Sequence, residues 1–284
     1  DEIIAAAHAV GVRVLVDAAQ LAPHRPLPRS ADFVAWSGHK MYAPFGCGVL
    51  VGPRSAFEEG DPFLVGGGAV ELVDLDRVIW TDPPDREEAG SPNVVGAVAL
   101  HAAMETLAGA GWPQLVEHDR SLARMLHSGL ESIAGVRVLG PSVSNRSTAE
   151  IPTVAFEIEG MSHALVAARL SAEYAIGVRH GCFCAHPYLI RLLGLSERDV
   201  TQFRQQVVQG DRSNMPGAVR ASAGVNVTEK DIERFLDSLE RVASGEPSPV
   251  EYRQDPESGD FSPATGDASW QPDFRSSAAY CSRG

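Results

Sequence analysis

A lysine in a short polar turn is the first residue whose type and place point to chemistry. The tetrapeptide 37–40, Ser-Gly-His-Lys, follows the apolar run 31–36, a pattern typical of a buried strand that ends in a turn. Only Lys40 and Lys230 are lysines among the 24 basic residues of the chain. A lysine, unlike an arginine, can lose its proton and form a Schiff base with a carbonyl group. On four residues alone, a surface lysine without a chemical role is an equal alternative.

The elements before this turn place a carboxylate beside the lysine. A helix over 1–10, closed by Gly11, leads into a strand at 12–16 that ends in Asp17. A helix, a turn and a strand with a polar residue at its end form half of a parallel α/β unit. Ligands bind beyond the carboxyl ends of the strands in such sheets, so we expect Asp17 and Lys40 near one ligand. The alternative for Asp17 is a turn or helix-cap residue.

Two further loops extend this first half of the chain. The residues 46–52 predict a third strand, close enough along the chain to pair with 31–36 as a hairpin. Gly90 and Ser91 precede a helix expected at 94–107, and the free N–H groups at such a helix start attract anions. A simple helix cap is the alternative role for these two residues, and both roles are compatible.

The second half of the chain has a different pattern, with α and β segments that do not alternate regularly. We expect helices at 113–133, 162–174, 188–209 and 228–243, and strands at 136–139, 153–158, 176–179 and 217–222. This order favours a smaller α+β domain. From Gly245 the sequence is rich in Pro, Ser, Gly and Asp, which predicts disorder. The expected organisation is a first domain over 1–112, a second over 113–245 and a disordered tail over 246–284.

Composition narrows the class of protein. The chain has 284 residues and a net charge of −13, which argues against a nucleic-acid binder or a protein of anionic membrane surfaces. No uncharged run approaches the roughly 20 apolar residues that span a bilayer, so no membrane contact is expected. The four cysteines do not form the pattern of a secreted disulfide framework. We therefore expect a cytoplasmic protein.

Three motifs in order carry a resemblance to a known family. They are Val-Leu-Val-Asp-Ala-Ala-Gln at 14–20, Ser-Gly-His-Lys-Met-Tyr-Ala-Pro at 37–44 and Glu-Ala-Gly-Ser-Pro-Asn at 88–93. Together they resemble the class V aminotransferases, and most of all the branch of cysteine desulfurases and selenocysteine lyases. The similarity runs from about residue 1 to 243. It implies the C-terminal part of a fold-type-I large domain with a mostly parallel sheet, followed by a smaller α+β domain.

The resemblance implies the cofactor pyridoxal 5′-phosphate and a role for each motif residue. Lys40 would hold the cofactor and move protons at the substrate carbon, and Asp17 would keep the ring nitrogen protonated. Gln20 would bond the ring hydroxyl. The remaining matches are phosphate contacts at Ser37, His39 and Ser91. Ser91 stands where the family usually has threonine and where a partner subunit contributes the contact, so a homodimer is implied; for His39, a packing role is the alternative.

The segment 179–187, Arg-His-Gly-Cys-Phe-Cys-Ala-His-Pro, matches a second family frame, in which an arginine is followed five residues later by a cysteine. By this resemblance Arg179 would bind the substrate carboxylate and Cys184 would take sulfur from cysteine as a persulfide, leaving alanine. The nearby His180 and His186 favour the thiolate of Cys184. Arg220 matches another arginine near the substrate.

This segment also departs from the family. Cys182 and Phe183 stand where well-studied desulfurases often carry histidines, and 188–216 is longer than the corresponding segment. A metal clip at Cys182 and Cys184 is an alternative that lacks a second ligand pair, and we expect no metal. Substrate class is therefore less firmly implied than the cofactor. Related branches transaminate, epimerise or cleave other amino acids, and they stay open as alternatives.

The start of the chain bears on the function as well. Family members carry a phosphate-binding loop and a ring-stacking aromatic residue before the strand of Asp17, and the sequence opens after that point. We therefore expect a truncated member whose full-length parent is the enzyme. The expected partners are an amino-acid substrate, a sulfur-acceptor protein and a second copy of the chain. A non-catalytic remnant that holds no cofactor is the alternative from a different functional class.

Overall fold

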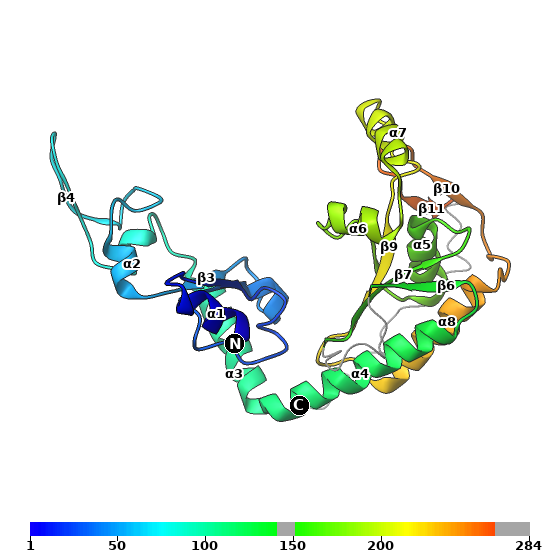
Figure 1. Ribbon diagram of the computed structural model, residues 1–284, viewed down its shortest axis with the longest axis horizontal. Coiled ribbons are helices and arrows are strands. Elements are labelled where there is room, and N and C mark those ends of the chain that lie inside the picture. Colours follow the sequence, from blue (N-terminus) through cyan, green and yellow to red (C-terminus); the bar gives the residue numbers. More distant parts are fainter. Residues whose placement is uncertain (141–150, 265–284) are drawn as a thin grey trace, which may run out of the picture. The chain divides into compact units, whose positions relative to one another are not determined.

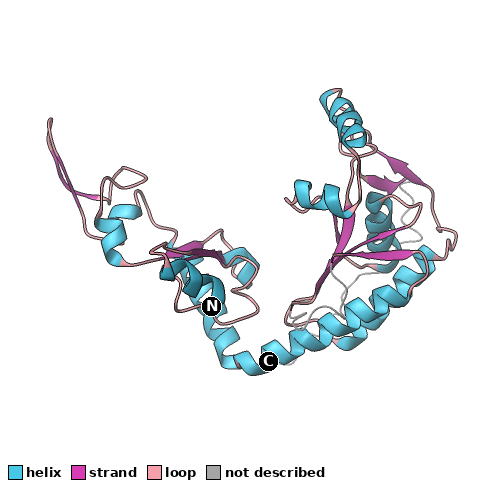
Figure 2. Cartoon of the chain, viewed as in Figure 1, coloured by secondary structure: helices cyan, strands magenta, loops and turns pink. Residues whose placement is uncertain are grey.

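The computed structural model describes residues 1–140 and 151–264, which divide into two compact units. Unit 1 is 1–117, and unit 2 begins at residue 118. The division falls inside helix α4 (Trp112–Ser132), a few residues after the boundary expected at 112/113. Figure 2 shows a mixture of helices and strands in both units. The chain therefore has the α/β character that the sequence predicted.

Unit 1 is built around a short three-stranded sheet. Its elements are α1 (Glu2–Ala9), β1 (Leu15–Asp17), β2 (Phe33–Ser37), the 3-10 turn η1 (Gly38–Met41), β3 (Gly48–Val51), α2 (Arg54–Glu58), β4 (Val70–Val73), β5 (Val78–Trp80), the 3-10 turn η2 (Asp85–Glu87) and α3 (Val94–Ala110). Strand β1 pairs with β2 in parallel, and β3 pairs with β2 as an antiparallel hairpin. The sheet is therefore mixed within this chain, and β4 and β5 form a separate hairpin that the sequence did not predict.

Unit 2 is an antiparallel sheet with helices packed against it (Figure 1). Its elements after α4 are β6 (Val136–Leu139), β7 (Thr153–Ile158), α5 (His163–Tyr174), β8 (Arg179–Gly181), α6 (His186–Leu192), α7 (Glu197–Val208), β9 (Ala218–Ser222), α8 (Glu229–Ala243), β10 (Tyr252–Gln254) and β11 (Phe261–Pro263). The strand order is β6-β7-β9-β8, and all three pairings are antiparallel. This is the α+β arrangement expected from the sequence.

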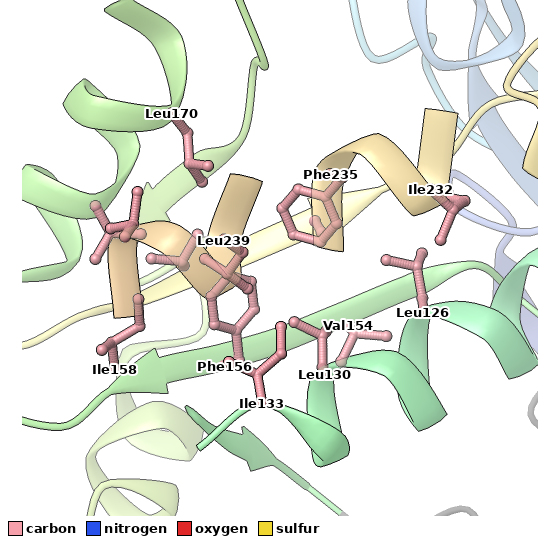
Figure 3. Close-up of a cluster of buried hydrophobic side chains, with 14 of the residues drawn as sticks. Leu126, Leu130, Ile133, Val154, Phe156, Ile158, Leu170, Ile232, Phe235 and Leu239 are labelled. Atoms are coloured by element: carbon pink, nitrogen blue, oxygen red, sulfur yellow. The ribbon is translucent and has the colours of Figure 1, made fainter. Parts of the chain in front are cut away.

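The core of unit 2 lies between this sheet and the helices α4, α5 and α8 (Figure 3). Alternate residues of β7 are buried, and Phe156 at its centre is fully enclosed. Phe156 meets Phe235 of α8 edge to face, with ring centroids 6.2 Å apart. A capping box of Thr228 and Asp231 starts α8, at the residue where the helix was expected to begin. This core holds the strands that carry the second group of candidate residues.

The segment 188–209, expected as one helix, forms parts of two helices. Helix α6 ends at Leu192, and Gly194 adopts a left-handed backbone with φ +68°. A new capping box of Ser196 and Asp199 then starts α7. The left-handed Gly194 and the capping box at Ser196 therefore divide the segment, although its sequence pattern is helical throughout.

The expected disorder from residue 246 is wrong for 246–264. This stretch forms the antiparallel pair β10 and β11 and packs against α5. Buried Arg169 and Glu173 of α5 hold it, because Glu173 accepts a hydrogen bond from Tyr252. Composition alone predicted disorder because it does not register such long-range contacts. The rest of the expected tail, 265–284, lies outside the described residues.

Among residues 1–140 and 151–264, no single helix has the length and apolar character needed to cross a membrane. Within these residues, only the pair α3 and α4 taken together is long and apolar enough, and the two helices meet at a bend of 84°.

Candidate active site

Lys40 lies in a tight turn at the carboxyl end of β2. The turn η1 is held by the backbone N–H of Gly38, which donates to the carbonyl of Cys47 at 2.7 Å. A Cβ atom on Gly38 would lie 2.9 Å from that oxygen, so the close approach requires glycine. Met41 is buried and anchors the turn, whereas His39 and Lys40 are exposed. The packing role considered for His39 is therefore not what the structure shows.

Asp17 and Ser37 end the two parallel strands at the same edge of the sheet. The register pairs Asp17 with Ala35, so Ser37 lies just beyond Asp17 along the neighbouring strand. The Asp17 carboxylate accepts the backbone N–H of Ala19 at 3.0 Å, which is the turn contact considered as its alternative role. Gln20 follows in the same turn and is exposed. Asp17, Gln20, Ser37 and the Lys40 turn are thus gathered at one edge of unit 1.

Ser91 belongs to a separate loop of unit 1, directly before α3. The cap of this helix is Asn93, whose side chain accepts the N–H of Gly96 at 2.9 Å. The same side chain donates to the carbonyl of Phe45 at 2.6 Å, in the loop that follows the Lys40 turn. The Ser91 loop and the Lys40 turn are therefore tied together, and Ser91 itself is exposed.

Arg179 and Arg220 stand side by side in unit 2, on the paired strands β8 and β9. Directly paired residues of antiparallel strands point to the same face of the sheet, so two like charges are held together. Burial, and then the charge of Arg179, lower the pKa of Arg220, whereas Cys184 acts in the opposite direction. The buried Nε of Arg220 has no hydrogen-bond partner among the described residues. Such a pair is suited to an anion that bonds both guanidinium groups.

Cys184 is carried on a tight turn next to these arginines. The N–H of Ala185 donates to the carbonyl of Cys182 at 2.8 Å, and both Phe183 and Cys184 have left-handed backbones, with φ +52° and +60°. Residues with side chains avoid this conformation, so neighbouring contacts must hold it. One such contact is the thiol of Cys182, which donates to the carbonyl of Pro216 at 3.1 Å. The turn presents Cys184 as an exposed thiol.

The two cysteines of this turn differ in their surroundings. Cys182 packs against the buried cluster of Leu139, Leu189 and Ala218, and burial raises the pKa of its thiol. A raised pKa leaves less of the reactive thiolate at neutral pH. Cys182 is thus a packed thiol and Cys184 an accessible one.

Among residues 1–140 and 151–264, no group of three histidine, cysteine or acidic side chains is arranged to hold a metal ion.

A cavity of about 340 Å³ in unit 2 contains Cys184 and Arg179. Three contacts of its lining residues were not predicted from the sequence. The guanidinium of Arg220 lies over the ring of Phe183 at 5.2 Å, a cation–π contact. The rings of His163 and His180 stack, and their Nδ1 atoms are 3.3 Å apart.

The third contact is made by Asp260 of the C-terminal segment, whose Oδ1 lies 3.4 Å from Nε2 of His180. The other ring of the histidine pair, His163, is tied by its Nε2 to the carbonyl of Met215 at 2.9 Å. Burial is the main cause that lowers the pKa of His163, and the charge of His180 adds to it. The sequence carried no local signal for these contacts, because the partners are far apart along the chain.

The candidate residues therefore form two sets, one in each unit. Unit 1 holds the Lys40 set with Asp17, Gln20, Ser37, His39 and Ser91, and unit 2 holds Arg179, Arg220 and Cys184. Strands position part of each set, whereas Ser91 and Cys184 lie in loops held by hydrogen bonds of Asn93 and Cys182. Chemically, the first offers an amine, a carboxylate and hydroxyl groups, and the second offers an anion-binding pair beside a thiol.

Solved and curated proteins resemble this chain over most of its length. A cysteine desulfurase of Escherichia coli (strain K12 / DH10B) is 32% identical over 245 residues, which are 85% of this chain and 53% of that protein. The crystal structure of the cysteine desulfurase CsdA from Escherichia coli matches with a TM-score of 0.70 at 32% identity, covering 85% of this chain and 54% of that one. The apo cysteine desulfurase of Thermococcus onnurineus NA1 matches with a TM-score of 0.73 at 32% identity, over 86% and 56%.

The chain spans about half the length of these relatives. The family model described as aminotransferase class V matches residues 1–235, which include both sets of candidate residues. Motifs, fold and comparisons agree on this point: the chain belongs to the class V aminotransferase family.

Proposed function

We propose that this chain carries the lysine and the cysteine of a pyridoxal-phosphate-dependent cysteine desulfurase. The observation that supports it most is the meeting of Arg179, Arg220 and Cys184 on paired strands and one turn. An anion site beside an exposed thiol fits an amino acid whose carboxylate is bound and whose side chain is attacked. The identity to proteins named cysteine desulfurases supports the same choice of substrate.

The residues of unit 1 fit the cofactor that the family implies. Pyridoxal phosphate would supply an electron sink for the substrate carbon. The carboxylate of Asp17 is suited to hold a proton on a ring nitrogen, and the exposed amine of Lys40 to bind an aldehyde. Gln20 would bond the ring hydroxyl. Ser37, His39 and Ser91 would donate hydrogen bonds to a phosphate group.

Each of four side chains then has its own role in the proposed reaction. Arg179 binds the carboxylate of L-cysteine as a two-pronged fork, and Arg220 adds a second positive charge there. The Lys40 amine moves a proton at the substrate Cα. The Cys184 thiolate attacks the substrate sulfur and forms the new S–S bond. The bond from that sulfur to Cβ breaks, its electron pair stays on the carbon side, and Cβ takes up a proton. The products are L-alanine and a Cys184 persulfide. The sulfur atom is transferred from the substrate to Cys184, and the reaction needs no added oxidant.

Sulfide and alanine production from L-cysteine in the presence of a thiol reductant tests this proposal. The chain with pyridoxal phosphate should form both products in equal amounts. Cys184→Ser should stop their formation, because a hydroxyl accepts no sulfur. Cys182→Ser is the matched control and should retain most of the rate, since its hydroxyl still bonds the Pro216 carbonyl. If Cys184→Ser retains the rate of the unmodified chain, the role given to Cys184 is wrong.

A persulfide must pass its sulfur on, so a sulfur-acceptor protein is part of the proposal. The exposure of Cys184 supports it, because an acceptor thiol can reach the turn. The proposed compartment is the cytoplasm, where thiols stay reduced. A homodimer is also proposed, since the valines after Ser91 are exposed.

A further inference from the structure

Residues 246–264 lie beyond the segment matched by the family model, yet they are built into unit 2. Their anchor is the buried ion pair of Arg169 and Glu173, whose side chains are 7% and 5% exposed. Glu173 accepts hydrogen bonds from Ser248 at 3.0 Å and from Tyr252 at 3.2 Å. The segment therefore satisfies buried charged groups and is a fixed part of the fold.

The tip of this segment is also held in place. The backbone N–H of Arg212 donates to the carbonyl of Pro256 at 2.7 Å, and its guanidinium donates to the carbonyl of Glu257 at 2.7 Å. Gly259 is buried, and a Cβ atom there would lie 2.6 Å from the Arg212 carbonyl oxygen. Gly259 also has a left-handed backbone with φ +81°, so only glycine can lie this close to the Arg212 backbone. The tip cannot shift without breaking these contacts.

The fixed tip forms one wall of the cavity that contains Cys184. Ser258, Gly259 and Asp260 line it together with Cys184 and Arg179. Asp260 supplies the negative charge of this lining, at 3.4 Å from a ring nitrogen of His180. The rest of the lining carries the positive groups Arg179 and Arg212 and the histidines His163, His180 and His186.

We propose that the segment 246–264 is a specificity-determining wall of the Cys184 cavity, and that Asp260 weakens the attraction of this otherwise positive cavity for anionic molecules. A carboxylate on the wall of a cavity this small repels a second negative charge that enters it. Asp260 is 61% exposed at its side chain, so solvent and salt weaken the effect without removing it. We expect a change of about two- to fivefold in reaction rate for a singly charged molecule.

Alkylation of the Cys184 thiol by two small reagents measures this selection directly. Iodoacetate is anionic and iodoacetamide is neutral, and the ratio of their rates at Cys184, followed by peptide mapping, cancels changes in thiol reactivity. In Asp260→Asn the iodoacetate-to-iodoacetamide ratio should rise about two- to fivefold at low salt, and the rise should shrink at high salt. The neutral reagent also shows whether the variant keeps the turn folded.

Glu257→Gln is the matched control. It removes the same charge from the same tip, but the Glu257 side chain does not line the cavity and only its backbone carbonyl bonds Arg212. Its ratio should equal that of the unmodified chain. An unchanged ratio in Asp260→Asn, or an equal rise in Glu257→Gln, overturns the proposal. The inference draws its biological meaning from the proposed role of Cys184, but its test needs only the thiol, so failure of sulfur transfer would leave this result standing.

Discussion

At the scale of single residues, Cys182 and Cys184 are close in sequence and different in environment. Cys182 donates to the Pro216 carbonyl and is packed, and burial raises its pKa. Cys184 is exposed on the same turn. The second thiol, which departs from the usual family pattern, is therefore an anchor of the turn. The accessibility of Cys184 supports its proposed role as the group that accepts sulfur.

Differential alkylation tests this distinction. With iodoacetamide near pH 8, Cys184 should react at least about tenfold faster than Cys182, because Cys184 is exposed whereas burial shields Cys182 and raises its pKa. Quantitative peptide mapping of both sites gives the two rates. Cys47, which is partly exposed, reports the behaviour of an ordinary thiol of the chain. Equal rates at Cys182 and Cys184 would contradict the anchoring role.

His163 makes the stability of unit 2 depend on pH. Burial lowers its pKa below the usual value near 6.5, so the unfolded chain binds more protons between these two pKa values. The free energy of unfolding should therefore fall as the pH drops below about 6.5, and the loss should be complete below the folded pKa. Urea unfolding at several pH values measures this, and His163→Gln should flatten the dependence. An identical pH profile in His163→Gln would show that other groups cause it.

At the scale of elements, the hairpin of β10 and β11 is held mainly by buried polar contacts. Burial, and next the charge of Glu173, raise the pKa of Tyr252, so its hydroxyl remains a donor. Tyr252→Phe removes one hydrogen bond to a buried carboxylate and should lower the free energy of unfolding by about 1–2 kcal/mol. Thermal or urea unfolding gives this difference. Tyr188→Phe, at a residue 57% exposed, is the control and should change little.

Local patterns predicted the elements whose signals are local. The strands β6 and β7 have the expected bounds, and the capping box of Thr228 marks the start of α8. The candidate residues that belong to compact motifs were also found, although their roles stay predictions. What the sequence did not predict depends on distant partners. Tyr252 and Glu173 are 79 residues apart, and no local pattern signals that pair.

At the scale of the whole molecule, the uncovered apolar side chains are concentrated in unit 1. Among the described residues, the exposed large hydrophobic side chains all lie within 1–117 except Tyr188 and Val208. They include Leu15 and Leu50 on the sheet, exposed by 58% and 52%. Parallel α/β sheets usually have both faces covered, so such residues indicate surfaces that bind further protein.

The start of α3 is the part of this surface next to Ser91. Val94, Val95 and Val98 are 62%, 63% and 64% exposed, and their spacing places Val94 and Val98 on one side of the helix. If a second copy of the chain covers them, replacing all three by serine should shift dimer to monomer in light scattering. Val208→Ser, at an exposed valine of unit 2, should leave the molar mass unchanged. A molar mass unaffected by the triple change would contradict the proposed interface.

We propose that Lys40 in unit 1 and Cys184 in unit 2 serve one reaction. The chain offers a built-in control, since Lys40 and Lys230 are its two lysines. The chain is incubated with pyridoxal phosphate and L-cysteine, and the mass of the Cys184 peptide is measured. We expect a gain of one sulfur atom at Cys184 in the unmodified chain and in Lys230→Arg, and none in Lys40→Arg. Sulfur at Cys184 in Lys40→Arg, or none in the unmodified chain, would contradict it.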